Sequence, residues 1–399
     1  MSTVETLAAS GSRSSLGELF TNLFKRAPVP FVAHMIDGSE VRIGEGTPAF
    51  HVFIRNESCF RAFRSMNELR IAKAYIRGDF DIEGDFIAAL SYRDVLRDRS
   101  VWLKAWRRLE PLLFGREKLN PAWIAKHYDM ENVQFFYTDE DYRTYTPGIY
   151  EHDEDTLEAG GRRKLEFALD SLGLQPGDTL LDIGCGWGGM LRCAAERGVR
   201  GTGITLSKHQ HAFVSTMINE KGYSAEVRYQ DFFTFEPART FDGISMMGVI
   251  EDLSDYHLVM QRLPRYLKPG GRVYLDFATS RKPFDTSSFI TRYVWPGTFR
   301  LVYLPEFIDA VNQSVFEIAA IYNDRHNYYL WSKHGYDRLV RNMSAILKRA
   351  TIEQYRMLRL LVAGSAALMS NTTRGDGACR VVLQMTRATD SGLGVSAAR

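Results

Sequence analysis

Hydrophobic positions in the first quarter of the chain alternate between helical spacing and short strand-like runs. Apolar side chains recur every three or four residues over 16–24 and again over 66–76, which predicts two helices. Compact apolar runs over 31–36 and 49–54 predict strands with turn residues between them. This pattern predicts a small α+β domain over residues 16–90.

The second half shows a different pattern, in which short apolar runs alternate with helix-like stretches. The run Thr179–Ile183 predicts a buried strand, and the residues from Met190 to Arg197 have the composition of a helix. Further strands are predicted over 201–206, 225–230, 241–250 and 272–278, with helices over 207–221 and 256–267. Such alternation is typical of a parallel sheet covered by helices. We therefore predict a Rossmann-like α/β domain over 120–390, preceded by the smaller α+β domain.

The last part of this domain departs from the alternation. Residues 281–307 are rich in aromatic residues and proline and have no clear period, so we predict an inserted cover over the carboxyl edge of the sheet. Two later strands, over 317–322 and 379–385, flank a long helical region over about 336–368.

Between the two predicted domains, residues 91–119 combine many Arg and Lys side chains with Trp, Leu and Phe. One interpretation is a basic amphipathic helix that lies on an anionic membrane surface. The other is an interdomain linker helix whose apolar face packs inward and whose basic face is solvated. Both interpretations predict the same periodicity, so the sequence leaves them open.

The composition excludes several classes of protein. The 399 residues include 50 Lys and Arg against 48 Asp and Glu, a net charge of +2 that argues against a broadly basic nucleic-acid binder. Four scattered cysteines without a C-x-x-C pair predict no disulfide framework and no metal site. The apolar run 358–369 is shorter than the roughly 20 residues that span a bilayer. We expect a cytoplasmic protein, with attachment to the inner membrane face left open, a disordered tail over 1–15 and a flexible tail over 391–399.

Four glycines follow the strand Thr179–Ile183 with the spacing G-x-G-x-G-G, and Asp182 precedes the first of them. A glycine turn between a strand and a helix lets a ligand approach the backbone with no Cβ in the way. This spacing suits the amino-acid end of S-adenosylmethionine better than a pyrophosphate. A glycine loop alone is weak evidence, so the other strand ends must support it.

Several further segments complete a recognisable set. They are His127-Tyr128-Asp129, Leu181 to Gly188, Gly203-Ile204-Thr205-Leu206-Ser207 with Gln210, Gln230-Asp231 and Leu267 to Gly271. With these segments the chain resembles the cyclopropane-fatty-acid synthases and mycolic-acid methyltransferases, which transfer carbon from S-adenosylmethionine to an alkene in a lipid acyl chain. The resemblance covers nearly everything after residue 15.

The resemblance implies which residues hold the cofactor. The glycines would hold the methionine carboxylate and ammonium, the end of the second strand would contact the ribose, and the end of the third would contact the adenine. The cofactor-binding residues so implied are Tyr145, Asp182, Gly184, Gly186, Gly188, Thr205, Leu206, Gln210, Gln230 and Asp231. The alternatives are that Gln210 is only a surface helix residue and that Asp231 is only a cap.

The resemblance also exposes a departure in the catalytic site. In the family a bicarbonate ion, held by a cysteine-region backbone amide, a glutamate, a histidine and a tyrosine, removes the proton. Here Glu251 and Tyr328 match the glutamate and tyrosine, but Pro147 replaces the cysteine and has no N–H. Asp276 replaces the histidine, and Asp252 replaces a second histidine. We therefore predict that the usual bicarbonate site is absent.

Three outcomes follow from this departure. Asp276 could replace bicarbonate as the proton acceptor. The reaction could instead end at a methyl-branched or methylene product. Or Glu251, Asp252 and Asp276 could bind a cationic or hydroxylated small molecule, as in related plant-type N-methyltransferases. Against all three stands the interpretation of Asp276 as a cap or ion-pair partner at its strand end.

Taken together, these observations predict an S-adenosylmethionine-dependent C-methyltransferase with Glu251, Asp276 and Tyr328 as catalytic residues. The expected substrate is the double bond of an unsaturated phospholipid acyl chain at a membrane surface, converted to a cyclopropane or methyl-branched product without bicarbonate. The alternative is a small-molecule C- or N-methyltransferase of a biosynthetic pathway. Nucleic acid is not an expected partner, and a homodimer is left open.

Overall fold

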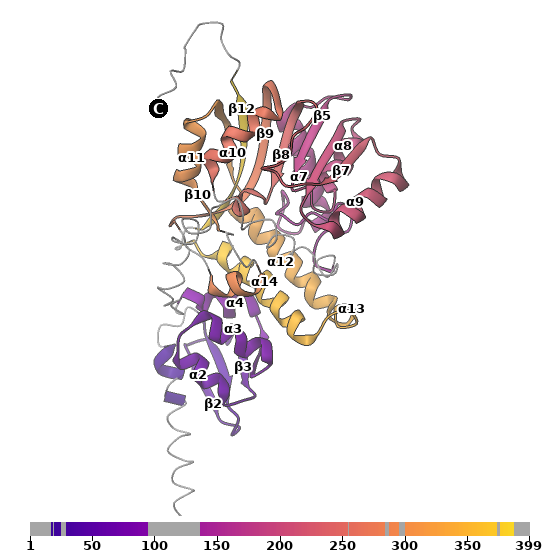
Figure 1. Ribbon diagram of the computed structural model, residues 1–399. Coiled ribbons are helices and arrows are strands. Elements are labelled where there is room, and N and C mark those ends of the chain that lie inside the picture. The colour runs from indigo at the N-terminus through magenta and orange to yellow at the C-terminus, as the bar shows by residue number, and fades with distance from the viewer. Residues whose placement is uncertain are drawn as a thin grey trace, which may run out of the picture.

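The structure is a computed structural model, in which an upper and a lower body are joined by helices (Figure 1). It describes residues 17, 18, 20–24, 29–94, 136–253, 255–283, 287–294, 300–372 and 376–386. Most of the predicted linker 91–119 lies outside the described residues, as do both predicted tails. Among the helices that are described, none is long and apolar enough to cross a membrane.

The N-terminal body is built on a four-stranded sheet in the order β2-β1-β3-β4. Its strands are β1 (Phe31–His34), β2 (Glu40–Ile43), β3 (Phe50–Ile54) and β4 (Phe80–Gly84). Its helices are α2 (Ser58–Arg64), α3 (Glu68–Arg77) and α4 (Phe86–Leu90), and a short 3-10 helix (Ser91–Asp94) follows. The pattern did not predict β2 and β4, because each is short and carries charged residues.

Aromatic side chains fill the core of this body. Phe31 on β1 and Phe50 on β3 stack with their ring centroids 4.8 Å apart. Tyr92 packs edge-on against Phe31 at 5.3 Å, and Phe24 packs edge-on against the same ring at 5.5 Å. The β1–β3 pair is parallel and places Phe31 opposite Phe50, so both rings point to the same face of the sheet.

The larger body contains an eight-stranded mixed sheet in the order β11-β12-β9-β8-β5-β6-β7, with β10 paired to β9. The strands are β5 (Thr179–Ile183), β6 (Arg200–Thr205), β7 (Ala225–Tyr229), β8 (Phe241–Met247), β9 (Leu267–Ser280), β10 (Val302–Tyr303), β11 (Phe316–Asn323) and β12 (Gly377–Met385). The five strands from β9 to β7 run parallel, whereas β12 is antiparallel to both of its neighbours, β9 and β11. The predicted α/β fold with a smaller N-terminal α+β domain is confirmed.

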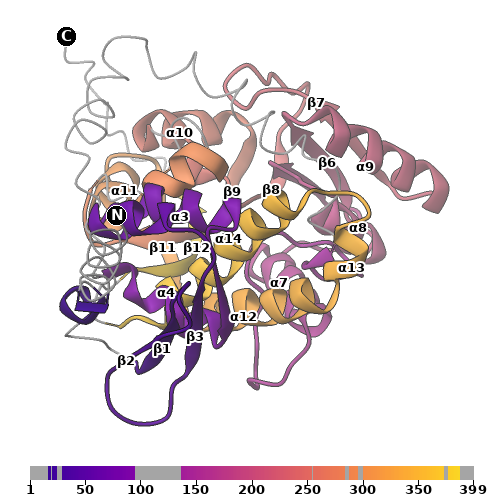
Figure 2. The same ribbon diagram turned by 90° about the horizontal axis from the view of Figure 1, so that it is seen from below.

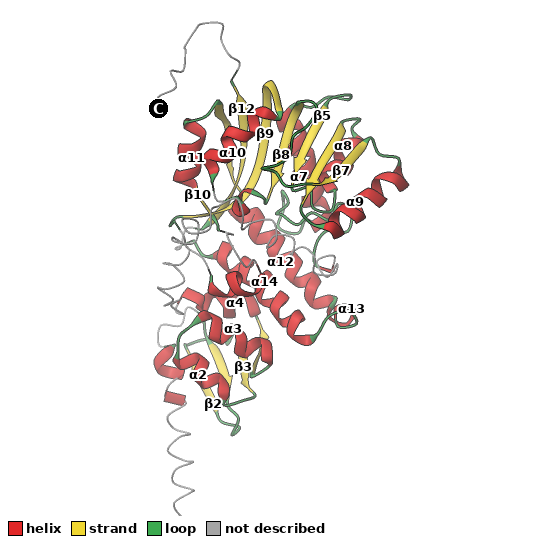
Figure 3. Cartoon of the chain, viewed as in Figure 1, coloured by secondary structure: helices red, strands yellow, loops and turns green. Residues whose placement is uncertain are grey.

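Helices cover this sheet on both faces (Figure 3). They are α7 (Leu157–Leu172), α8 (Gly189–Glu196), α9 (Lys208–Lys221), α10 (Tyr256–Arg262) and α11 (Leu304–Asn312). The strand order reverses beside β5, whose neighbours are β6 and β8. In open α/β sheets, ligands bind at the carboxyl ends of the strands at such a reversal.

The predicted helical region over 336–368 consists of more than one helix. It is divided among α12 (Arg325–Arg341), α13 (Met343–Ile346) and α14 (Ile352–Ser370). A new helix begins because Thr351 and Gln354 form a capping box, each side chain accepting a hydrogen bond from the other residue's backbone N–H. Residues 281–307 are also more regular than expected, since they contain a π-helical turn (Ile290–Val294), β10 and the start of α11.

Helix α14 joins the two bodies. In Figures 1 and 2 it lies beside α3 and α4, and it also packs along α12. Arg356 on α14 reaches Asp81 at 2.6 Å and donates to the backbone oxygen of Tyr75 at 2.9 Å. Arg359, one turn further on, donates to the Tyr75 hydroxyl and lies 4.0 Å from the centre of the Phe86 ring.

Candidate active site

A large cavity of about 1780 Å³, including space open to solvent, lies at the carboxyl ends of the parallel strands. Twelve of the thirteen predicted site residues line it: Tyr145, Asp182, Gly184, Gly186, Thr205, Leu206, Gln210, Gln230, Asp231, Glu251, Asp276 and Tyr328. Gly188 does not line the cavity but begins α8 in the left-handed conformation, with a φ of 82°. The carboxyl ends of parallel strands meet at one edge of a sheet, which explains why these residues gather there.

The glycine loop has two glycines with different roles. A Cβ added to Gly184 would lie 2.4 Å from Val249 Cγ2, so this glycine is required by packing. At Gly186, with a φ of 53°, an added Cβ would meet no heavy atom of the described chain within 4 Å. The loop is fixed because the Gly184 and Cys185 N–H groups both donate to Ile204 O at 3.0 Å. Gly186 therefore leaves open space over a fixed backbone, which fits a ligand such as the methionine end of S-adenosylmethionine.

Asp182 lies near the end of β5, immediately before the glycine loop. Its Oδ1 accepts a hydrogen bond from Ser245 Oγ on β8 at 2.6 Å, and the side chain is buried. Burial raises the pKa of Asp182 to about 7. A cation bound above it would favour its ionised form.

The part of the cavity that is predicted to hold the ribose is formed by the end of β6 and the start of α9. Thr205 Oγ1 donates to Gln210 Oε1 at 2.8 Å, and both side chains are buried. Ser207 caps α9 by accepting a hydrogen bond from the Gln210 N–H. The alternative in which Gln210 is a surface helix residue is therefore wrong.

The part that is predicted to hold the adenine is formed by the residues that follow β7. Gln230 donates through its backbone N–H to Thr205 O at 3.0 Å, which fixes this segment to β6. Asp231 Oδ1 accepts a hydrogen bond from the Phe233 N–H at 2.7 Å, so its carboxylate caps a turn while it lines the cavity. Capping and cofactor contact are thus compatible at Asp231.

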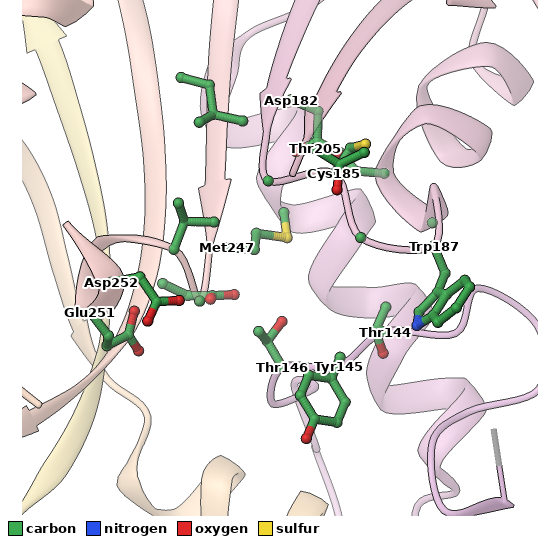
Figure 4. Close-up of a pocket in the computed structure, with 18 of the residues that line it drawn as sticks. Thr144, Tyr145, Thr146, Asp182, Cys185, Trp187, Thr205, Met247, Glu251 and Asp252 are labelled. Carbon is green, nitrogen blue, oxygen red and sulfur yellow. The ribbon is translucent and has the colours of Figure 1, made fainter. Parts of the chain in front are cut away.

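Acidic side chains occupy the opposite side of the cavity (Figure 4). Glu251 and Asp252 belong to a 3-10 turn after β8, and Glu251 Oε1 accepts a hydrogen bond from the Ala278 N–H at 2.9 Å. Glu251 Oε2 accepts none within the described residues. Burial raises the pKa of Glu251 to about 8 and that of Asp252 to about 7. The ionised forms of both carboxyl groups are therefore unfavourable in the ligand-free cavity.

Asp276 on β9 belongs to the same acidic group but has a cationic partner. Lys164 Nζ on α7 lies 3.3 Å from Asp276 Oδ2 and donates a short hydrogen bond to Thr146 Oγ1. Lys164 is only 1% exposed. Burial raises the pKa of Asp276, and the charge of Lys164 opposes this rise. Asp276 Oδ1 accepts no hydrogen bond within the described residues and is free to take a proton.

Lys164 was not predicted as a site residue, because no helix was predicted over the residues of α7. The signal was available, since the buried face of α7 repeats at helical spacing and Lys164 interrupts it between Gly161 and Leu165. A lysine on an otherwise apolar helix face is rarely buried without a partner.

Aromatic side chains form the wall between the acidic group and the cofactor loop. Tyr328 and Tyr145 both pack against Trp331, with ring centroids 5.6 and 6.2 Å away. Tyr137 donates a hydrogen bond from its hydroxyl to that of Tyr145 at 3.2 Å. Burial, and then the charge of Glu251, raise the pKa of Tyr328, so it remains a neutral phenol. Trp331 was not singled out in the sequence because a Tyr/Trp stripe is more often plain core.

These residues fit S-adenosylmethionine, and they differ from the bicarbonate site that the resemblance implies. The glycine loop offers open space and the acidic side of the cavity favours a cation such as the sulfonium. An anion would enter among Glu251, Asp252 and Asp276, and Pro147 in the cavity wall has no N–H to donate to it.

Comparison with known proteins agrees with this geometry. The model of the family described as mycolic acid cyclopropane synthetase matches residues 116–374. A probable fatty acid methyltransferase of Mycobacterium tuberculosis is 27% identical over 393 residues, covering 89% of this chain and 90% of that protein. The sphingolipid C9-methyltransferase of Candida albicans is 24% identical and covers 75% of this chain and 63% of that protein.

Solved structures share the fold. The cyclopropane synthase MmaA2 from Mycobacterium tuberculosis superposes with a TM-score of 0.61 at 24% identity, covering 67% of this chain and 99% of that one. A coclaurine N-methyltransferase bound to N-methylheliamine and S-adenosylhomocysteine gives 0.63 at 16% identity, covering 78% of this chain and 98% of that one.

Proposed function

Because the chain belongs to the mycolic acid cyclopropane synthetase family and is an S-adenosylmethionine-dependent methyltransferase, we propose that it methylates a double bond in an unsaturated phospholipid acyl chain without bicarbonate. The observation that carries this proposal is the buried pair of Asp276 and Lys164 at the place where the resemblance implies an anion. The family acts on lipid double bonds, so the proposal concerns the particular lipid and the identity of the base.

The cofactor supplies an electrophilic methyl group on a sulfonium. Gly184 and Gly186 would hold its amino-acid end, Thr205 with Gln210 would contact the ribose, and Asp231 would contact the adenine. Asp182 and Glu251 line the same cavity as acidic groups whose ionised form a bound cation would favour.

The transfer step moves one electron pair from the alkene to the methyl carbon. The π pair of the double bond forms the new C–C bond while the C–S bond breaks, and that bond's electrons stay on sulfur. A carbocation remains on the acyl chain. The faces of Tyr145, Tyr328 and Trp331 stabilise it, because aromatic rings present negative potential to a cation.

Asp276 then takes the proton that leaves. Asp276 lines the cavity, its Oδ1 accepts no hydrogen bond within the described residues, and Lys164 compensates the charge of its ionised form. If the proton comes from the transferred methyl group, the released C–H pair closes a cyclopropane. If it comes from the neighbouring chain carbon, that pair forms a new double bond and the product is a methyl-branched alkene.

The test uses the purified enzyme, S-adenosylmethionine with an isotopically labelled methyl group and vesicles of dioleoyl phosphatidylglycerol. We expect label in the lipid at the same rate in carbonate-depleted buffer and after bicarbonate is added. NMR of the extracted lipid then separates cyclopropyl protons from a branched alkene. A several-fold increase in rate with bicarbonate would contradict the assignment of Asp276 as the base.

The same acidic group supports a second candidate, a methyltransferase for a cationic small molecule. Glu251, Asp252 and Asp276 are buried carboxyl groups that would pair with an amine. This candidate predicts no label in lipid, and a rate on an amine substrate that is indifferent to vesicles.

We also propose that the enzyme works at a membrane surface. The support is the combination of Arg, Lys and Trp over 91–119, most of which lies outside the described residues. Co-sedimentation with anionic but not with zwitterionic vesicles is the expected result.

A further inference from the structure

A second cavity of about 1680 Å³, including space open to solvent, lies between the N-terminal body and the catalytic body. One wall comes from the N-terminal body and includes Phe31, Phe50 and Ala72. The opposite wall comes from α14 and includes Gly364 and Leu368.

The second cavity adjoins the cofactor cavity. Ala278, Tyr328, Leu361 and Ser365 line both cavities, so the two share a wall at the place where the acyl cation is stabilised. A chain whose double bond lies against Tyr328 therefore has one end beside this second cavity.

Gly364 is the clearest sign that the second cavity is built for a ligand. It sits inside α14, where glycine weakens a helix relative to alanine. Its backbone does not require glycine, because its φ is not positive. Packing does not require it either, since an added Cβ would meet no heavy atom within 4 Å among the described residues. The space that it leaves opens into the cavity.

Three polar side chains of this cavity interact with one another, and most of the remaining lining is aromatic or aliphatic. Arg93 Nε lies 2.8 Å from Glu68 Oε1, which also accepts a hydrogen bond from Ser287 Oγ at 2.7 Å. Deeper inside, stacked Phe31 and Phe50 face the cavity. The lining therefore suits a ligand segment that carries no polar group.

We propose that this second cavity holds the methyl-terminal half of the substrate's acyl chain, so that the N-terminal body selects chain length. The inference rests on the proposed lipid substrate. The methyl-terminal half is the part without a headgroup, whereas the other half must lead back to water. The N-terminal wall lies outside residues 116–374, so it is not part of what the family model matches.

The experiment compares Gly364→Leu, which fills the cavity, with Gly364→Ala as the matched control. Vesicles carry tetradecenoyl, hexadecenoyl or octadecenoyl phospholipids whose cis double bond starts at the same carbon. For the wild-type enzyme, kcat/KM should rise with each methylene beyond the double bond that the cavity accommodates. The rise per methylene should stay well below about fourfold, the value for transfer from water, because the chain leaves a bilayer. In Gly364→Leu we expect at least a tenfold loss on the longest chain and little loss on the shortest. Gly364→Ala, which adds a single methyl group to the same space, should show a smaller loss on the longest chain than Gly364→Leu does.

Two further measurements keep the result interpretable. S-adenosylmethionine affinity by calorimetry should be unchanged in both variants, which shows that the cofactor cavity is intact. Ala72→Phe, which fills the opposite wall, should reproduce the loss if Gly364→Leu does not fold. Fluorescence of cis-parinaric acid reports occupancy without catalysis and should weaken in both filled variants.

The outcomes separate this inference from the proposed function. If the wild-type enzyme labels lipid but Gly364→Leu keeps its chain-length dependence, the cavity assignment is overturned while the lipid substrate stands. A dependence on the carbons before the double bond, and not beyond it, overturns the assignment as well. If no lipid is labelled at all, the proposed function fails, and parinaric acid binding that the filled variants lose still supports an apolar ligand.

Discussion

The two cavities share Tyr328 but are built in opposite ways. The cofactor cavity contains buried carboxyl groups at Asp182, Glu251, Asp252 and Asp276, all with raised pKa values. The second cavity is lined mainly by aromatic and aliphatic side chains, and its ion pair between Glu68 and Arg93 lies nearer to solvent. The two cavities are therefore similar in volume, but the lining of the first suits a cation and the lining of the second suits an uncharged chain.

The two linings have opposite effects on the stability of the ligand-free protein. Apolar side chains in the second cavity stabilise the fold whether or not a ligand is present, because they also form the core of the N-terminal body. The buried acids of the first cavity cost free energy in the ligand-free protein, and the charge of Lys164 together with hydrogen bonds from Ser245 and the Ala278 N–H offsets part of that cost. Substitutions in the two cavities should therefore have different effects on activity and on stability.

The largest effect should come from Asp276→Asn. The amide keeps the shape of the side chain but cannot take the proton, so we expect product formation to fall about 10²–10⁴-fold. Affinity for S-adenosylmethionine, measured by calorimetry, should stay within about threefold. Asp252→Asn is the control, since it removes a neighbouring acid and should have a smaller effect. Retention of nearly full turnover in Asp276→Asn would leave only the ion-pair role for this residue.

Lys164→Met tests the same pair through stability. Removal of one partner of a buried ion pair leaves an uncompensated charge, so the free energy of unfolding should fall by about 3–5 kcal/mol. The double variant Lys164→Met/Asp276→Asn should regain most of that loss, because neither charge is then buried. Denaturant unfolding monitored by fluorescence measures both. Additive losses in the double variant would show that the pair is not coupled.

The site was largely predictable because its residues follow consecutive strands. Asp182, Thr205, Asp231 and Glu251 each end or follow a parallel strand, and the sheet brings those ends to one edge. Lys164 could not be placed in this way. It comes from α7, and only the packing of that helix on β9 puts its ammonium beside Asp276.

The second cavity could not be predicted from the sequence for a related reason. Phe31 and Phe50 have the spacing of ordinary core residues, and Gly364 has that of an unremarkable helix glycine. Their meaning depends on how α14 lies against the N-terminal sheet, which is a tertiary contact. The predicted helical region began at about residue 336, whereas α12 begins at Arg325. The first turns of α12 were missed because the run from His326 to Tyr336 mixes polar and aromatic residues and shows no continuous apolar face.

The acidic cavity should also give stability a pH dependence that the apolar cavity lacks. The pKa of Glu251 is raised to about 8 in the folded protein, so between about pH 5 and 8 the folded state binds more protons than the unfolded state. Stability of the ligand-free protein should therefore be highest at the acidic end of this window and fall as pH rises. Glu251→Gln should reduce that slope by up to about 1.4 kcal/mol per pH unit. Thermal unfolding across this range, with Glu68→Gln as control, measures it.

The smallest effect should come from Asp81→Asn, which tests how firmly the N-terminal wall is held. Asp81 pairs with Arg356 at 2.6 Å and is about one-third exposed, so we expect a stability loss of less than about 1 kcal/mol. The wall of the second cavity would loosen, and KM for a long-chain lipid should rise a few-fold while S-adenosylmethionine affinity stays constant. Asp79→Asn is the matched control, because Asp79 pairs with Arg77 inside the N-terminal body. An equal rise in KM in both variants would mean that general softening, and not the contact with α14, sets lipid affinity.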